Sequence, residues 1–182
     1  MNYFLESEKI YLRAFTMEDI PIWYTWFNDP AVTEHVNKGF FPNTAELQEG
    51  YFHAISKSDN DVQLAVVLKE NDLLVGIIGI HKIDWLHRRG DISVFIGDKA
   101  QWGKGIATEA ISLAVKHAFL KLNLRKVTAG MWSSNIGCKR SFEKNYFALE
   151  GTLKKQFFCK GSYVDEYRMG LFKEEWESRA KI

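Results

Sequence analysis

The sequence has few of the residues that signal a disulfide framework, a metal centre or a membrane anchor. Its 182 residues include two cysteines, Cys138 and Cys159, and three prolines. Because no CxxC pair occurs and no histidines or cysteines cluster at ligand spacing, neither a disulfide scaffold nor a metal site is predicted. No stretch approaches the roughly 18 apolar residues of a membrane helix, and charges interrupt the N-terminal apolar segment, unlike a standard signal peptide. We therefore expect a cytoplasmic protein.

An excess of charge of one sign is also absent. The 24 Lys and Arg residues nearly balance the 23 Asp and Glu residues, which leaves a formal net charge of +1. No overall field attracts the chain to nucleic acid or to an anionic membrane, so we expect neither as a partner. Any anionic ligand must then be bound by a local site rather than by an overall positive charge. The length and the ordinary globular composition predict one domain over residues 1–182.

Aromatic residues, in contrast, are plentiful and concentrate near the N-terminus. They make up 14% of the chain, and two explanations stay open: they fill the core, or they form the rim of a pocket for a flat or partly apolar ligand. The N-terminal group consists of Trp23, Tyr24, Trp26, Phe27, Phe40, Phe41, Tyr51 and Phe52.

The hydrophobic pattern predicts a mixed α/β fold around one sheet. Strands are expected at 9–15, 62–68, 73–80, 90–97, 125–131, 147–158 and 162–172, and helices at 16–29, 44–57, 104–122 and 134–145. In the strand 90–97, the alternation turns Ile92, Val94 and Ile96 toward the core. Asp91 then points to the opposite face, into a cleft. The helix 44–57 is expected to face inward with Ala45, Leu47, Tyr51, Phe52 and Ile55.

A glycine-containing turn joins the strand 90–97 to the long helix 104–122. Such a turn exposes backbone N–H groups at a helix N-terminus and forms a binding site for phosphate. The dinucleotide pattern GxGxxG fails because Thr108 stands at its third glycine. The P-loop pattern fails because five residues separate Gly97 from Gly103, and Lys104 is followed by Gly105 rather than Ser or Thr.

The turn resembles the acetyl-CoA-binding loop of the GNAT superfamily of N-acetyltransferases. That loop reads Gln/Arg-x-x-Gly-x-Gly/Ala, and this chain matches it at Gly103 and Gly105 with Ala100 at the first position. The segment WGKGIATEA resembles the corresponding segment in the branch of ribosomal-protein alanine N-acetyltransferases. The resemblance continues through HAFLKLNLRKV, Asn135-x-x-Cys138 and ALEG to GSYVDEYRMGLF. It implies a mostly antiparallel, twisted sheet that splays at the acetyl-CoA site, with helices on both faces.

The resemblance also implies which residues bind acetyl-CoA as cosubstrate. Asn135 would touch the pantetheine, although a helix N-cap is an equally good explanation for it. The backbone of Val94, Phe95 and Ile96 would pair with the pantetheine arm. The pyrophosphate would lie on the turn formed by Trp102, Gly103, Lys104, Gly105, Ile106, Ala107 and Thr108.

The implied reaction is direct attack of a neutral primary amine on the thioester within a ternary complex, which calls for a base and an acid. Phe142 stands where many relatives carry the tyrosine acid, so Ser141, Ser134 or water would replace it. Glu150, in ALEG, and Asp91 are the candidate bases; Glu150 is otherwise an exposed strand carboxylate, and Asp91 a partner of Arg88 or Arg89. Further candidates are Glu34, His35, His81 and His87.

The acceptor would be recognised by the first two helices, the stretch 28–42 and the last hairpin. A protein N-terminus or a small amine suits these segments, with a nucleotide-linked amino sugar as the alternative. A non-catalytic acyl-CoA-binding module is the alternative from another class. Cys138 is expected to serve packing rather than nucleophilic catalysis, and a homodimer is left open.

Overall fold

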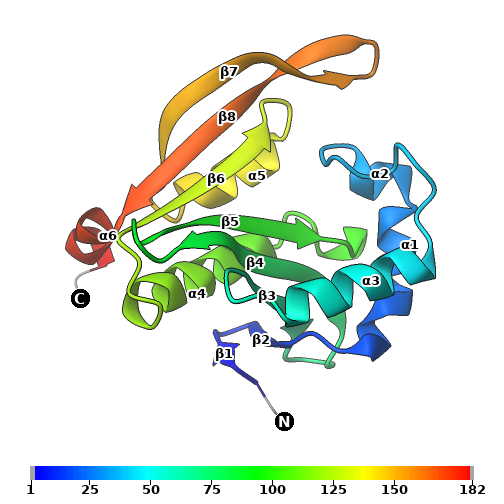
Figure 1. Ribbon diagram of the computed structural model, residues 1–182, viewed down its shortest axis with the longest axis horizontal. Coiled ribbons are helices and arrows are strands. Elements are labelled where there is room, and N and C mark those ends of the chain that lie inside the picture. Colours follow the sequence, from blue (N-terminus) through cyan, green and yellow to red (C-terminus); the bar gives the residue numbers. More distant parts are fainter. Residues whose placement is uncertain (1–2, 181–182) are drawn as a thin grey trace.

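The computed structural model describes residues 3–180 and contains one open eight-stranded sheet with helices on both faces (Figure 1). The strand order is β1-β2-β3-β4-β5-β6-β8-β7, and all neighbours are antiparallel except β5 and β6. The strands are β1 (Leu5–Glu6), β2 (Ile10–Ala14), β3 (Val62–Leu68), β4 (Leu74–Asp84), β5 (Arg89–Ile96), β6 (Lys126–Trp132), β7 (Ala148–Cys159) and β8 (Ser162–Phe172). The helices are η1 (Met17–Asp19), α1 (Ile20–Phe27), α2 (Pro30–Thr33), α3 (Ala45–Ser56), η2 (Lys99–Gln101), α4 (Ile106–Leu120), α5 (Ile136–Glu143) and α6 (Lys173–Ala180).

Two hydrophobic cores cover the two faces of the sheet. The larger one packs α4, with Ile111 and Phe119, on the strand face that carries Ile92. The smaller one packs Trp23 of α1 on the face that carries Phe95. The predicted alternation along β5 is therefore confirmed. Of the N-terminal aromatics, Trp23, Trp26 and Phe27 are buried in the smaller core, as the first explanation requires, whereas Phe40 and Phe41 are 64% and 84% exposed.

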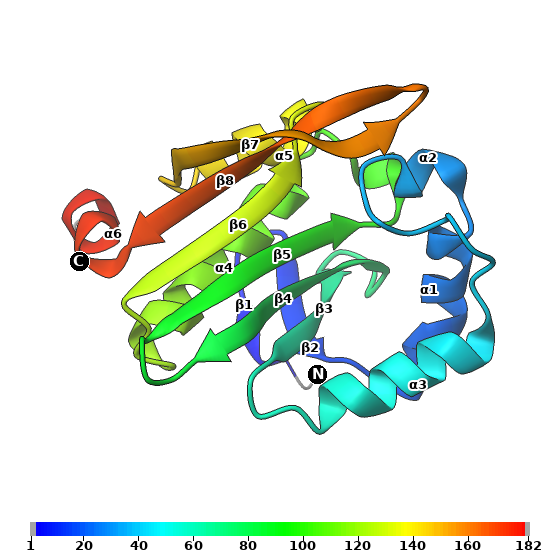
Figure 2. The same ribbon diagram turned by 45° about the horizontal axis from the view of Figure 1, so that its top comes forward.

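The sheet splays between β5 and β6. These parallel strands share only three register pairs, from Arg89↔Lys126 to Asp91↔Thr128. Beyond Asp91, β5 stays paired with β4 as far as Ile96, while β6 stays paired with β8 as far as Trp132. Figure 2 shows the two strands diverging toward α1 and α2. The sequence expectation of a sheet that opens at this point is confirmed.

The inward face predicted for α3 is correct in its second half, where Phe52 and Ile55 are half-buried, and wrong at its start, where Ala45 is exposed. Leu47 is 60% exposed, and Gln48 is the buried residue of this helix at 5% exposure. The side-chain amide of Gln48 donates to Asn43 Oδ1, so its polar group is satisfied inside the protein. The helix contacts the sheet through Tyr51, whose hydroxyl donates to Gln63 of β3 at 2.7 Å.

Two helices were not predicted from the sequence. The short α2 starts directly after α1 because the Asp29 side chain accepts the Ala31 N–H at 2.9 Å, with Pro30 at the first helical position. At the other end of the chain, α6 brings Trp176 against Phe119 with ring centroids 5.5 Å apart.

Within residues 3–180, no helix is both long and apolar enough to cross a membrane.

Candidate active site

The turn before α4 has the backbone geometry that suits an anion. Gly103 and Gly105 have φ values of +77° and +86°, which glycine adopts without strain, and nothing lies within 4 Å of a Cβ built at either position. The first N–H to bond within the helix is that of Glu109, which donates to Gly105 O at 3.1 Å. The N–H groups of Ile106, Ala107 and Thr108 precede it and point out of the helix end. A phosphate group fits this open cradle at the positive end of the helix dipole.

One side-chain hydrogen bond attaches this turn to the end of β5, because the Trp102 indole N–H donates to Ile96 O at 2.8 Å. Between them, the Asp98 side chain caps η2 by accepting the Ala100 N–H at 2.9 Å. Lys104 is exposed beside the cradle. The turn is thereby held at the place where β5 and β6 have separated.

The three β5 residues predicted to meet the pantetheine lie beyond the last pair with β6. Val94, Phe95 and Ile96 are hydrogen-bonded partners of β4, and their other edge faces the gap toward β6. An extended ligand can add to such an edge as a strand does.

The residues of the asparagine motif lie on α5. Asn135 is the N-cap of this helix, and its Oδ1 accepts the Cys138 N–H at 3.1 Å, so the N-cap explanation is confirmed. The Ser141 hydroxyl donates to Gly137 O of its own helix at 3.0 Å. Phe142, at the position of the family tyrosine, is 2% exposed and packs edge-on against Phe147.

Asp91 lies at the vertex of the splay, on the sheet face opposite α4. It belongs to the last β5–β6 pair, and the Thr128 hydroxyl lies 3.4 Å from its Oδ1. Burial raises the pKa of Asp91, and the nearby charges of Arg168 and Lys82 act against this rise. A carboxylate with a raised pKa is a stronger base than an exposed aspartate.

Glu150 of β7 is separated from Asp91 of β5 by two strands, β6 and β8, and lies near the paired end of β6. Its carboxylate forms an ion pair with Lys126 Nζ at 2.7 Å and covers Gly170, where an added Cβ would lie 2.4 Å from Oε1. The structure therefore places the two predicted bases apart and gives each a different partner.

A further acidic residue near the vertex was not predicted. Glu166 of β8 is 5% exposed, and its Oε1 forms an ion pair with Arg168 Nε at 2.9 Å. Both side chains lie over Gly130 of β6, where an added Cβ would be 2.7 Å from Glu166 Oε1. The glycine inside the strand 126–132 was the available signal, because such a glycine marks a close approach.

The remaining candidates have their own partners. Glu34 forms an ion pair with Lys160, and His35 Nδ1 lies 3.3 Å from the Ser134 hydroxyl. His81 Nδ1 lies 3.1 Å from Asp61 Oδ1. His87 is exposed on the turn between β4 and β5, and its backbone N–H donates to Asp84.

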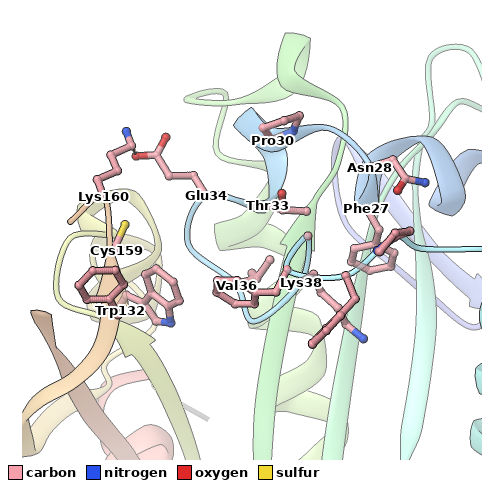
Figure 3. Close-up of a pocket in the computed structure, with 15 residues that line it drawn as sticks. Phe27, Asn28, Pro30, Thr33, Glu34, Val36, Lys38, Trp132, Cys159 and Lys160 are labelled. Atoms are coloured by element: carbon pink, nitrogen blue, oxygen red, sulfur yellow. Dashed lines mark hydrogen bonds and ion pairs between the residues drawn. The ribbon is translucent and has the colours of Figure 1, made fainter. Parts of the chain in front are cut away.

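A cavity of about 550 Å³ opens where the ends of β5 and β6 diverge. Figure 3 shows Trp132 and Cys159 on the side of the β7–β8 hairpin and Phe27, Val36 and Lys38 on the side of α1 and α2. The wall on the α1 side reaches β5, because the Phe27 ring lies 5.0 Å from that of Phe95. The cavity therefore touches the end of β6 directly through Trp132, while the ring of Phe27 lies between it and Phe95 of β5.

The family match identifies a chain with this splayed sheet, glycine turn and cavity as an acyltransferase. The model of the acetyltransferase (GNAT) domain matches residues 9–148, and the chain belongs to this family. It is an N-acetyltransferase, and its cosubstrate is acetyl-CoA.

Three proteins illustrate the similarity. The probable N-acetyltransferase YjcK of Bacillus subtilis is 32% identical, with 95% of this chain and 99% of that protein covered. The spermidine N(1)-acetyltransferase of Vibrio cholerae is 26% identical, with 96% and 99% covered. The crystal structure of a Vibrio cholerae spermidine N-acetyltransferase in complex with CoA and spermine has a TM-score of 0.84 at 22% identity, with 92% and 97% covered.

Proposed function

We propose that the chain transfers the acetyl group of acetyl-CoA directly to a primary amine in a ternary complex. The divergence of β5 and β6 between the anion-binding turn and the cavity is the observation that carries this proposal. A coenzyme bound at the turn and an amine bound in the cavity would approach each other in the opening between the two strands. Direct transfer needs only this approach, a base and an oxyanion donor.

The coenzyme would be held mainly by backbone groups. The turn 102–108 would bind the pyrophosphate, with Lys104 beside it, and the free edge of Val94–Ile96 would pair with the pantetheine arm. An N–H group of this edge would polarise the thioester carbonyl. Asn135 already accepts a bond at Oδ1 as the N-cap, and its amide nitrogen is available to the pantetheine.

Asp91 is the proposed base. Its position at the vertex and its raised pKa both support the removal of a proton from the acceptor ammonium, directly or through water. Glu150 is the alternative base. The ion pair with Lys126 occupies its carboxylate.

The acid that protonates the departing thiolate is proposed to be Ser141. Its hydroxyl donates to Gly137 O in this structure, so a χ1 rotation must precede this role. Departure as an unprotonated thiolate is the alternative, because the buried ring of Phe142 has no proton to give.

The state of Cys138 supports direct transfer rather than an acetyl-cysteine intermediate. Burial raises its pKa to about 12, so it is a neutral thiol at physiological pH, and only the thiolate is a nucleophile. Cys138 and Cys159 are both free, which supports a cytoplasmic location.

The acceptor is proposed to be a small amine or a protein N-terminus. The Vibrio cholerae relatives, which by name act on spermidine, support a small amine. The ribosomal-protein alanine branch and a homodimeric assembly stay predictions.

Release of the free CoA thiol from acetyl-CoA, measured over a panel of amines, peptides and nucleotide-linked amino sugars, tests the function. We expect at least one small amine or peptide to accelerate release well above the rate with water. If no member of the panel does so while acetyl-CoA still stabilises the protein against heat, the chain is an acyl-CoA-binding module rather than an enzyme.

A further inference from the structure

The charges and rings around the cavity between α2 and the β7–β8 hairpin define a class of acceptor. We infer that the acceptor is a primary amine with an apolar body and no second cationic group, and that polyamines are poor substrates. This inference rests on the proposed function, because it assigns the cavity to the acceptor.

The lining of the cavity is mostly apolar. The side chains that set this character are Phe27, Val36, Phe40, Phe41, Trp132 and Phe158. The two sides of the cavity are rigid, because Trp132 stacks on Phe157 at 4.9 Å and Phe27 packs on Phe95. A volume of about 550 Å³ is sufficient for a small molecule that buries an aliphatic or aromatic group.

The charged side chains that line the cavity leave it positive. Glu34 is the carboxylate of the lining, and Lys160 Nζ lies 2.6 Å from its Oε1. The Lys160 ammonium lowers the pKa of Glu34, which is therefore ionised and already paired at neutral pH. Lys38 adds a second ammonium, for which the described part of the chain supplies no carboxylate within ion-pair distance.

One aromatic ring of the lining, that of Phe27, already holds a cation from the protein itself. Lys38 Nζ lies 5.7 Å from the centroid of the Phe27 ring and 6.0 Å from that of Tyr51. An aromatic face attracts a cation at this distance. A ligand ammonium would have to displace Lys38 from these rings or share them with it, and like charges at close range repel.

A polyamine does not match the positive charge and the apolar lining of this cavity. When one amine loses its proton for attack, a triamine such as spermidine still carries about two positive charges in neutral water. Both would enter a cavity with two lysines and one neutralised carboxylate. A monoamine becomes uncharged when it is deprotonated, and its apolar body gains from burial against the aromatic wall.

Steady-state kinetics with two probes test the inference. We expect wild-type kcat/KM for 2-phenylethylamine to exceed that for spermidine by about tenfold or more. Lys38→Glu reverses one charge of the lining and should shift the ratio toward spermidine by about tenfold or more. Lys38→Met, which removes the charge only, should shift it by less. Lys57→Glu is the matched control, because this exposed lysine follows α3 outside the cavity and carries the same change of charge.

The outcomes separate the inference from the proposed function. A wild-type preference for spermidine overturns the inference and leaves the acetyltransferase intact. An equal shift in Lys38→Glu and Lys57→Glu, or none in either, shows that Lys38 does not face the acceptor and also overturns it. If the wild-type protein acetylates none of the amines, the proposed acetyltransferase function is refuted. Thermal unfolding of Lys38→Met, which keeps a long side chain, controls for a folding defect.

Discussion

Among single residues, Asp91 connects the backbone geometry of the splay with the chemistry proposed for it. It belongs to the last residue pair before β5 and β6 part, so its side chain lies beside the opening. Arg168 is near enough to weaken the effect of burial on the pKa of Asp91 and is itself paired with Glu166. The base candidate therefore belongs to a group of charged side chains, with Arg168, Glu166 and Lys82, rather than standing alone.

Asp91→Asn should lower kcat/KM by about 100-fold or more, because general-base catalysis contributes about this much. The dissociation constant of acetyl-CoA should change little, since the substitution keeps the shape of the side chain. Asp91→Glu should recover part of the rate. Steady-state kinetics with a responsive amine, together with calorimetric titration of acetyl-CoA, provide the two measurements.

Two further measurements, the stability of Asp91→Asn and the rate of Glu150→Gln, show whether a loss of activity in Asp91→Asn is the loss of a base. A buried carboxyl with a raised pKa gains a stabilising proton only at low pH, so above that pKa its ionised form costs stability. Asp91→Asn should therefore be at least as stable as the wild type at neutral pH, which excludes unfolding as the cause of lost activity. If Glu150→Gln lowers the rate more than Asp91→Asn does, Glu150 is the base instead.

For single residues, the sequence predicted the strand face on which a side chain lies but not the side chains that it contacts. The alternation in 90–97 was sufficient to place Asp91 on the open face, because neighbouring strand residues point to opposite faces. The surroundings of Glu150 depend on an irregular register between Leu149 and Gly151 in the pairing of β7 with β8. An irregularity of this kind changes which strand residues meet, and no spacing in the sequence predicts it.

Among the structural elements, the turn from β5 to α4 carries the coenzyme proposal. Its two glycines have a backbone conformation that side chains disfavour, and both have free space around them. A substitution there therefore tests the backbone conformation and access to the N–H groups rather than a clash.

Gly103→Val and Gly105→Val should each abolish measurable acetyl-CoA binding while the protein stays folded. A β-branched residue at a positive φ costs roughly 1–2 kcal/mol, and its side chain would also cover the cradle. Gly161→Val is the matched control: its φ of +82° and open surroundings give the same strain in the β7–β8 turn. Calorimetric titration is the measurement, and unchanged affinity in both loop variants would refute the loop assignment.

The ends of most elements could be predicted because capping and turn residues act locally. Thr44 accepts the Leu47 N–H at the start of α3, as the predicted start after Asn43 and Thr44 requires. The face of α3 could not be predicted in the same way. Its buried side was decided by which neighbours it meets, and Gln48 is buried because Asn43 happens to satisfy its amide.

For the whole molecule, a near-neutral net charge means that any anionic ligand must be bound by local groups rather than by an overall positive field. The net charge of +1 supplies little attraction for a polyanion, and the turn before α4 supplies backbone N–H groups instead. Binding to the folded state alone should then be visible as a gain in stability.

Acetyl-CoA at about 100 times its dissociation constant should add about 2.7 kcal/mol to the free energy of unfolding. For a domain of this size, that gain raises Tm by about 5–10 °C. Differential scanning calorimetry should show one transition with and without ligand, as expected for one domain over residues 1–182. Two separate transitions, or an unchanged Tm at saturation, would contradict the single domain or the coenzyme site, respectively.

By itself, the sequence determined most of the helices and strands, the glycine turn before the long helix and the family resemblance, since these depend on local periodicity, capping and glycine spacing. Tertiary structure alone decided where β6 joins and leaves β5, because strand pairing joins residues far apart in the chain. It also decided that Lys160 neutralises Glu34 across 126 positions and that Lys38 lies over Phe27. The charge of the acceptor cavity, and with it the proposed choice of amine, follows from those long-range contacts.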